Sequence, residues 1–386
     1  MRQTRKRFRP IRTLIIFAVF VVVAAVAVKA VSTPNPKAYL SSFFSAPVTH
    51  LKDIYHESVD FFGDVISSSS DDQDIADSGK SVEQHIADFD SVFETDSQFY
   101  TAEYLLANFP SAKACRATIY STKDVTTKVR FEVEYNEEYK VLAVRENQNF
   151  NLLNPKELQI YNAVEYIIEN AITADMTDFE KELTIHDFII NNCAYDNENY
   201  LNHTVPEDSF TSYGVLIKHT AVCEGYAKTF RMFMEALGIP CDFVVGKGNS
   251  GDHGWNRVRL DGEYYNVDVT WDDPVSDSGD TLSYRYFNVT DSAFSVNHTP
   301  TAAYSTAAVA TKYNYFYYFD LVITSQEEFN SKIRAAINAG QREITLLCAG
   351  DLLAENIDRS IVFDYISATT FNQSIDKVMN TITIYV

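Results

Sequence analysis

The segment between Cys223 and Thr270 constrains the fold of this chain more than any other part of its sequence. A helix is predicted to begin near Cys223, because apolar side chains then recur at helical spacing until Gly238 and Pro240 stop the pattern. A short apolar run at 241–245 follows and is typical of a strand. The apolar face of the helix is expected to consist of Tyr226, Phe230, Phe233, Met234 and Leu237.

Two further strands are predicted at 253–260 and 263–270, on either side of the dipeptide Asp261-Gly262. An Asp-Gly pair between two strands is a strong signal for a two-residue hairpin turn. The turn fixes the register of the two strands. It therefore places His253 and Asp268 on one face, as diagonal neighbours within reach of each other. The expected pairs are Leu260 with Glu263, Trp255 with Asp268, and His253 with Thr270.

Cys223, His253 and Asp268 are the candidate catalytic residues. A helix N-terminus stabilises a thiolate through its positive dipole end, and Cys223 is predicted to stand there. A carboxylate beside an imidazole can orient the ring and stabilise its cation. Taken singly, the three could be a buried structural cysteine, a surface histidine and a solvated acid. A thiol at a helix start, followed by His and Asp on one hairpin face, is what nucleophilic catalysis requires.

At these residues the sequence resembles the transglutaminase-like superfamily, which includes peptide N-glycanases and bacterial cysteine proteases with a papain-like core. The resemblance covers roughly residues 155–300 and rests on motifs in the order and with the short spacing of that family. It implies an α+β fold: a transglutaminase-like, papain-like core in which a helix carrying the cysteine packs on an antiparallel sheet carrying the histidine and aspartate. The motifs are IHDFIINNCAYD, AVCEGYAKTFRMFMEALGIPC, GDHGWNRVRLDGEYYNVDVTWDDP and, less specifically, YFNVTDSAF before His298.

The resemblance also implies a role for each candidate. Cys223 is the expected nucleophile, His253 the general base and then the general acid, and Asp268 the acid that orients the histidine. The backbone N–H of Cys223 is expected to help bind the tetrahedral oxyanion. Three aromatic residues are expected to line or support the site, with packing in the core as the alternative for each: Tyr213, Trp255 and Trp271.

The implied reaction is attack of a thiolate on a peptide amide carbonyl, which gives an acyl-enzyme that water or an amine resolves. Water would make the protein a peptidase or amidase, a lysine would make it a cross-linker, and the sequence leaves both open. The competing class is a catalytically silent surface protein that keeps the fold for binding or as a scaffold. The presence of all three triad residues favours an enzyme. A disulfide from Cys223 to Cys193 or Cys241 is a further alternative.

Residues 1–31 are predicted to be a targeting segment, because a basic cluster precedes an apolar run from Leu14 to Val28. We expect an uncleaved membrane anchor, with a cleaved signal sequence as the alternative. The positive-inside rule places the basic cluster in the cytoplasm. The expected location is therefore the cell membrane, single-pass with an extracytoplasmic catalytic domain, or secreted if the segment is cleaved. Surface or cell-wall peptides are then the expected substrates.

Four more regions are expected after this segment. Residues 32–81 are predicted to be a flexible tether, because their Ser and Asp content cannot bury enough apolar surface. Residues 82–150 are expected to be rich in β-structure, with strands at 115–120 and 128–135. The catalytic domain is expected to occupy 151–304. Its first two helices are expected to open at Asn154-Pro155 and at the capping-box pair Thr177 and Glu180.

Residues 305–386 are expected to form a small α/β domain without catalytic residues of its own. The predicted order is strand, helix, strand, helix, strand. An aromatic run at 313–323 is the first predicted strand, and a helix at 326–339 follows it. The remaining predicted elements are a strand at 343–348, a second helix and a final strand at 381–386.

The charge and cysteine content of the chain exclude several other functions. The chain carries 53 acidic and 32 basic residues, a net charge of −21, and such a surface repels nucleic-acid phosphates. Its five scattered cysteines include no Cys-x-x-Cys pair, so they predict neither a disulfide framework nor a metal site. We expect no metal, no cofactor and no nucleic acid. The expected partners are a protein or peptide substrate and, through the N-terminal segment, the membrane.

Overall fold

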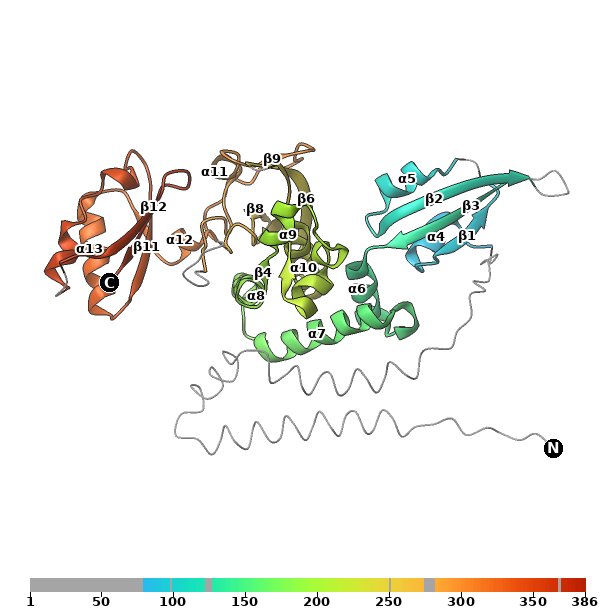
Figure 1. The fold of residues 1–386 in the computed structure, drawn as a ribbon, viewed down its shortest axis with the longest axis horizontal. Helices are drawn as coiled ribbons and strands as arrows, with labels where there is room; N and C mark the ends of the chain where they lie inside the picture. Colours follow the sequence, from blue (N-terminus) through green and yellow to red (C-terminus); the bar gives the residue numbers. More distant parts are fainter. Residues whose placement is uncertain (1–78, 98, 122–126, 250, 274–281, 367–368) are drawn as a thin grey trace, which may run out of the picture. The chain divides into compact units, whose positions relative to one another are not determined.

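The computed structural model describes residues 79–97, 99–121, 127–249, 251–273, 282–366 and 369–386 (Figure 1). The predicted membrane segment and the predicted tether up to residue 78 lie outside these residues, as does the acidic stretch at 274–281. Of the helices that are described, none combines the length and apolar character needed to cross a bilayer.

The first described part is a small antiparallel sheet in the strand order β1-β3-β2. Strands β2 and β3 contain the two strands predicted for this region, and both predictions are confirmed. In β3 the side chains of Val129, Phe131 and Val133 are buried on one face, as the alternating pattern predicted. The elements are α4 (Val82–Ala87), β1 (Val92–Thr95), α5 (Ala102–Asn108), β2 (Ala112–Ser121) and β3 (Thr127–Tyr135).

Helices α6 (Glu137–Asn147), α7 (Pro155–Ala171) and α8 (Asp178–Asn192) follow, with a 3₁₀ turn, η1 (Phe150–Leu152), after the first. The predicted starts of α7 at Asn154-Pro155 and of α8 at the Thr177–Glu180 capping box are confirmed, and α7 has a capping box as well. The Asn154 side chain accepts from the Glu157 N–H at 3.0 Å, and the Thr177 hydroxyl accepts from the Glu180 N–H at 3.3 Å. These caps satisfy backbone donors that a helix start otherwise leaves unpaired.

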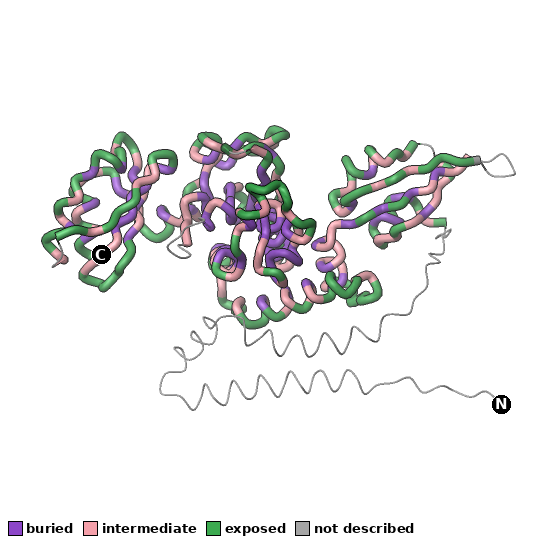
Figure 2. Tube along the Cα trace, viewed as in Figure 1, coloured by how far each residue is buried: buried purple, intermediate pink, exposed green. Residues whose placement is uncertain are grey.

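Helix α10 (Cys223–Ala236) begins at the predicted cysteine and is the centre of the catalytic core. Every residue from Gly225 to Met234 is buried, because the helix packs against α6, α8 and a sheet (Figure 2). Gly238, with a φ of 77°, follows the helix end, as expected for a left-handed C-terminal glycine. The short elements between α8 and α10 are β4 (Ala194–Tyr195), α9 (Asn197–Asn202), η2 (Glu207–Phe210), η3 (Gly214–Lys218) and β5 (Thr220–Ala221).

The sheet beside α10 has the order β8-β7-β6-β9 and is antiparallel throughout. The predicted hairpin turn is confirmed: Leu260 pairs with Glu263, and Asp261 and Gly262 adopt φ values of 49° and 86°. The strand predicted at 263–270 ends earlier, because a turn closed by the Asp272 N–H on the Asp268 carbonyl, at 3.1 Å, follows it. The strands are β6 (Cys241–Gly248), β7 (Gly251–Leu260), β8 (Glu263–Val267) and β9 (Thr299–Pro300), with α11 (Asp291–Phe294) before β9. The predicted α+β fold, with an antiparallel sheet, is confirmed.

The C-terminal residues form a mixed sheet in the order β10-β11-β13-β12 with a hydrophobic core of their own. The predicted helix at 326–339 and the predicted strands at 343–348 and 381–386 are confirmed. The bounds are β10 (Val322–Ile323), α13 (Gln326–Asn338), β11 (Glu343–Cys348), β12 (Asn372–Asp376) and β13 (Thr381–Tyr385).

Two other predictions for this region are wrong. The aromatic run at 313–323 is not one strand: its middle forms a short helix, α12 (Tyr315–Tyr318), and its only strand is β10. The Asn314 side chain caps α12, and the Tyr315 ring stacks on Tyr284 with centroids 3.6 Å apart. In place of the second helix, the described residues form two 3₁₀ turns, η4 (Ala354–Asn356) and η5 (Ser360–Asp364), followed by β12.

Candidate active site

Cys223 is the first residue of α10, directly after the extended residue Val222, and its side chain is partly exposed. All five cysteines are free, so Cys223 is not in a disulfide with Cys193 or Cys241. Burial raises the pKa of the other four thiols, to about 11 for Cys115 and Cys348. The same cause raises the pKa of Cys193 to about 12 and that of Cys241 well above its usual value. Those four thiols are therefore poor nucleophiles at neutral pH.

His253 and Asp268 lie within hydrogen-bond distance, as predicted, but the predicted pairs Trp255–Asp268 and His253–Thr270 are not formed, because the ladder ends at Asn256–Val267. The Nε2 atom of His253, in β7, lies 2.7 Å from Oδ2 of Asp268, which directly follows β8. Both side chains are buried, with exposed fractions of 9% and 0%. Because Nε2 is engaged with the carboxylate, Nδ1 is the ring nitrogen left to interact with Cys223, which contributes to the raised pKa of His253.

The Asp268 carboxylate is held by four donors. Its Oδ1 atom accepts from the backbone N–H groups of Thr270, at 3.1 Å, and Trp271, at 3.2 Å. Its Oδ2 atom accepts from His253 and, at 2.9 Å, from Nε2 of His298. Burial alone would raise the pKa of Asp268, but the charges and hydrogen bonds of the two histidines outweigh burial and lower that pKa. Asp268 is therefore an anion at neutral pH.

His253 is the cationic partner of this carboxylate. Burial lowers its pKa, but the charge and hydrogen bond of Asp268, with a smaller effect from Cys223, raise the pKa to about 10. His253 therefore carries a proton at neutral pH. An imidazolium beside a thiol at a helix start stabilises the thiolate and can protonate a departing amine.

His298 was not among the residues predicted for the site. It lies 30 residues after Asp268 in the chain, directly before β9, and only 2% of it is exposed. No helix or strand periodicity and no turn motif connects His298 to the hairpin. The sequence therefore did not predict the contact of His298 with Asp268. The available signal was the motif YFNVTDSAF, which precedes His298 and marked the resemblance without indicating a role.

The structure brings Trp255 and Trp271 to the triad and places Tyr213 elsewhere. The His253 ring centroid lies 6.0 Å from that of Trp255 and 5.2 Å from that of Trp271. Trp255 is fully buried and donates through Nε1 to the Tyr304 hydroxyl at 3.2 Å. Tyr213 is buried beside α6, where its N–H donates to the Glu137 carboxylate.

Tyr195 is a second neighbour of the site that the sequence did not predict. It lies in β4, where it pairs with Ala221, two residues before Cys223. Burial and, next in size, the negative charge of Cys223 raise the pKa of Tyr195. The parallel pairing of β4 with β5 thus carries this tyrosine to the start of α10.

His253, Asp268 and His298 could also hold a metal ion, since one ligand atom from each lies within 4.8 Å of the others. The two Nε2 to Oδ2 distances, 2.7 and 2.9 Å, are hydrogen-bond lengths. Two ligands at about 2.0–2.1 Å from one tetrahedral zinc ion would be about 3.3 Å apart. The observed distances therefore fit a shared carboxylate better than a metal centre.

Comparison with known proteins places this site in a family. Residues 166–269 match the profile of the transglutaminase-like superfamily, and the matched segment includes Cys223, His253 and Asp268. The Kyphoscoliosis peptidase of Mus musculus is 24% identical over 161 residues, which are 37% of this chain and 24% of that protein. The Kyphoscoliosis peptidase of Homo sapiens is 25% identical over 156 residues, 36% of this chain and 23% of that protein.

The chain thus spans about a quarter of the length of these relatives. A solved structure described as a TGase is 16% identical, with a TM-score of 0.27, and covers 50% of this chain and 54% of its own. The family assignment therefore comes from the profile match. Residues 166–269 are therefore a transglutaminase-like domain.

Proposed function

We propose that the chain is a cysteine enzyme that transfers or hydrolyses acyl groups of peptide amides. The observation that carries the proposal is the pairing of Asp268 with Nε2 of His253 at 2.7 Å, which leaves Nδ1 for the Cys223 thiol at the start of α10. Cys223 is the nucleophile, His253 the general acid and base, and Asp268 the residue that fixes the histidine ring.

The reaction follows from these positions. The Cys223 thiolate attacks the amide carbonyl carbon, and a carbon–sulfur bond forms as the carbonyl oxygen becomes an oxyanion. His253 then gives its proton to the amide nitrogen while the carbon–nitrogen bond breaks and the amine leaves. Water or a second amine attacks the thioester, and His253 takes up the proton of that nucleophile. The carbon–sulfur bond breaks and returns the thiolate–imidazolium pair.

Several observations guide the choice of substrate. The relatives are named as peptidases, which makes hydrolysis of a peptide bond the first reaction to test. The acidic chain favours peptides that carry positive charge. The basic and apolar N-terminal segment supports a membrane-anchored enzyme whose substrates are surface or cell-wall peptides. Cross-linking through a lysine amine remains the second reaction to test.

The proposal is tested by alkylating the full-length protein with iodoacetamide from about pH 4 to pH 9 and mapping the modified cysteines by mass spectrometry. Wild type is compared with His253→Ala. We expect Cys223 to react fast below neutral pH in wild type and slowly in the variant, because the imidazolium stabilises the thiolate. Cys115 is the internal control, since it is also partly exposed but its pKa is raised to about 11.

If Cys223 follows the same pH profile as Cys115 in both proteins, the triad is not functional. The better account is then a binding or scaffold protein that has kept the fold. If Cys223 shows the expected reactivity, peptide amides with and without an added amine acceptor distinguish hydrolysis from transfer.

A further inference from the structure

The carboxylate oxygen that holds the catalytic histidine is shared with a second buried histidine. Asp268 Oδ2 lies 2.7 Å from Nε2 of His253 and 2.9 Å from Nε2 of His298. We propose that His298 is a positioning residue: its hydrogen bond locks the Asp268 carboxylate in the orientation that aims His253 at Cys223. This inference rests on the proposed function, because it assigns His298 a role in the same triad.

The surroundings of His298 fix the ring itself. Its Nδ1 atom lies 2.7 Å from Oδ1 of Asn297, whose side-chain amide donates to the Tyr286 hydroxyl at 2.7 Å. On one face, the imidazole stacks on Phe294 with centroids 3.8 Å apart and planes 20° apart. The Trp271 ring centroid lies 4.2 Å away. His298 is therefore held by stacking and by hydrogen bonds at both ring nitrogens.

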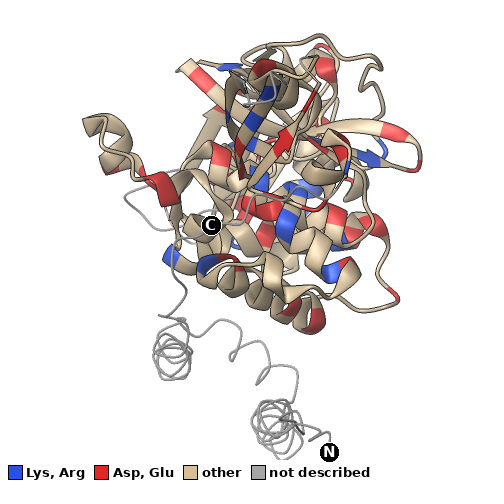
Figure 3. Cartoon of the chain, turned by 90° about the vertical axis from the view of Figure 1, so that its right-hand side faces the viewer, with Lys and Arg blue, Asp and Glu red and all other residues tan. Residues whose placement is uncertain are grey.

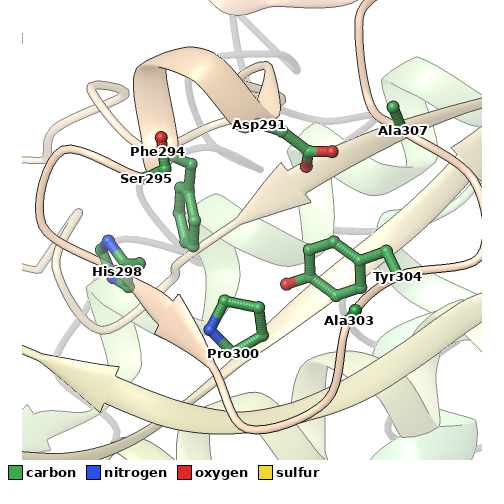
Figure 4. A pocket seen from close by; sticks show the side chains of 8 residues that line it. All are labelled: Asp291, Phe294, Ser295, His298, Pro300, Ala303, Tyr304 and Ala307. Carbon is green, nitrogen blue, oxygen red and sulfur yellow. The ribbon is translucent and has the colours of Figure 1, made fainter.

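A packing role would account for the stacking but not for the direction of Nε2. Figure 4 shows His298 and Phe294 side by side at one edge of a cavity of about 330 Å³, with Pro300 and Tyr304 also lining it. A phenyl ring would fill this wall as well as an imidazole. It could not donate to Asp268, so the choice of histidine is explained by the carboxylate and not by the cavity.

The hydrogen bond acts on the half of the carboxylate that the backbone does not hold. The N–H groups of Thr270 and Trp271 both bind Oδ1. Without His298, Oδ2 would keep only the bond to His253, the group that must move protons during the reaction. A donor that takes no part in proton transfer keeps Oδ2 in place while His253 gains and loses its proton.

The test compares three variants of the full-length protein. His298→Phe keeps the stacked ring and removes the donor, whereas His298→Gln restores an N–H donor at similar reach. His85→Phe is the matched control: His85 is also buried, binds Asp90 at 2.7 Å and stacks on Phe93. Two quantities are measured: the rate of Cys223 alkylation at neutral pH, and the NMR signal of the His253 ring N–H that faces Asp268.

We expect His298→Phe to slow alkylation about tenfold to a hundredfold, the value of one hydrogen bond to a charged group. Its His253 N–H signal should broaden or disappear through exchange with water. His298→Gln should recover most of the rate and the signal. His85→Phe should leave both unchanged, even if its melting temperature falls.

Each other outcome overturns the proposal. If His298→Phe keeps the rate and the His253 signal, His298 is a packing residue. If His298→Gln is as slow as His298→Phe, the donor is not what matters. If the purified protein holds one equivalent of a transition metal that His298→Phe loses, the three side chains form a metal site. The NMR signal reports on Asp268 and His253 even where Cys223 is unreactive, so a failure of the proposed function is seen separately.

Discussion

At the scale of single residues, the site is built around one negative charge. Asp268 is fully buried, and four donors keep it ionised although burial opposes ionisation. Its carboxylate in turn holds the pKa of His253 at about 10. One carboxylate thus sets both the orientation and the charge of the histidine, which makes Asp268 the residue whose charge is most informative to remove.

Asp268→Asn keeps the size of the side chain and removes its charge. Without that charge, burial dominates, and we expect the pKa of His253 to fall below 6.5. Alkylation of Cys223 at neutral pH should then fall by about thirtyfold, because a thiol with an ordinary pKa of about 8.5 is only a few per cent thiolate at pH 7. NMR titration of the His253 ring and the alkylation rate check the two effects. A variant that keeps a high His253 pKa would show that another group holds the proton.

The sequence was informative at this scale wherever a local rule applies. The Asp261-Gly262 turn fixes a register that runs as far as the pair Asn256–Val267, and His253 and Asp268 meet just beyond the end of that ladder. His298 reaches the same carboxylate from a segment 30 residues further on, through the packing of α11 and β9, and no short-range rule gives that contact. Tyr213 is near the cysteine in sequence, but its hydroxyl contacts Gln159 of α7.

At the scale of elements, the position of Cys223 depends on how closely α10 approaches the segment before it. A Cβ atom added at Gly225, in the first turn of α10, would lie 2.7 Å from the Ser209 carbonyl oxygen and 3.1 Å from that of Thr211. The Val222 N–H donates to the same Ser209 oxygen at 2.9 Å, so this backbone cannot easily retreat. The helix start is therefore held against η2.

Gly225→Ala tests that contact. Alanine favours a helix by about 1 kcal/mol over glycine, but the clash with backbone should shift the first turn and move Cys223 away from His253. We expect alkylation of Cys223 to slow on the order of a hundredfold, the cost of a displacement of about 1 Å. Gly340→Ala is the control. Alanine is strained at the φ of 79° found here, but open space surrounds the position, so the added Cβ meets no other atom. Equal slowing in both variants would point to general destabilisation.

Helix α8 carries a buried acid whose charge state should affect stability. Glu182 is fully buried and accepts a hydrogen bond from the Asn288 amide at 2.8 Å. Burial raises its pKa to about 8, against an ordinary value of 4.5. Between these values the unfolded chain releases a proton that the folded protein keeps. Glu182 therefore lowers the free energy of unfolding as the pH rises from 4.5 to about 8.

Glu182→Gln should remove this loss. We expect the variant to match wild type near pH 4.5 and to exceed its free energy of unfolding by on the order of 2 to 4 kcal/mol at pH 8. Urea unfolding of the full-length protein at several pH values measures the difference. Glu169→Gln, at an exposed position of α7, controls for the chemical change. A stability difference that does not depend on pH would show that Glu182 is ionised throughout.

Sequence rules for elements succeeded where a polar side chain or a glycine marks an end. The starts of α7 and α8, the end of α10 before Gly238 and the Asp261-Gly262 turn were predicted from such residues. The aromatic run at 313–323 has high strand propensity but forms α12 instead, because its rings stack on residues far away in the chain. Strand propensity supported this prediction without a residue that marks an end of the strand, and tertiary packing decided the structure instead.

At the scale of the whole molecule, charge divides the chain into two unlike parts. Acidic residues are spread over the described part of the chain (Figure 3). Residues 1–30 have the opposite character, with Arg and Lys before the apolar run of Leu14 to Val28 and no acid. A basic flank next to an apolar run has a preferred orientation across a membrane, with the bases on the cytoplasmic side.

The segment is either a membrane anchor or a cleaved signal sequence. The two are distinguished by fractionating cells that express the full chain or a variant without residues 1–31. If residues 1–31 are an anchor, the full chain should sediment with membranes and resist extraction by alkaline carbonate. Protease added outside the cell should then digest the catalytic domain. Removing residues 1–31 should leave that part soluble in the cytoplasm. A cleaved signal sequence predicts a soluble extracellular protein whose new N-terminus is found by mass spectrometry. If the full chain is soluble inside the cell with its N-terminus intact, the membrane proposal is wrong, and cytoplasmic peptides become the substrates to test.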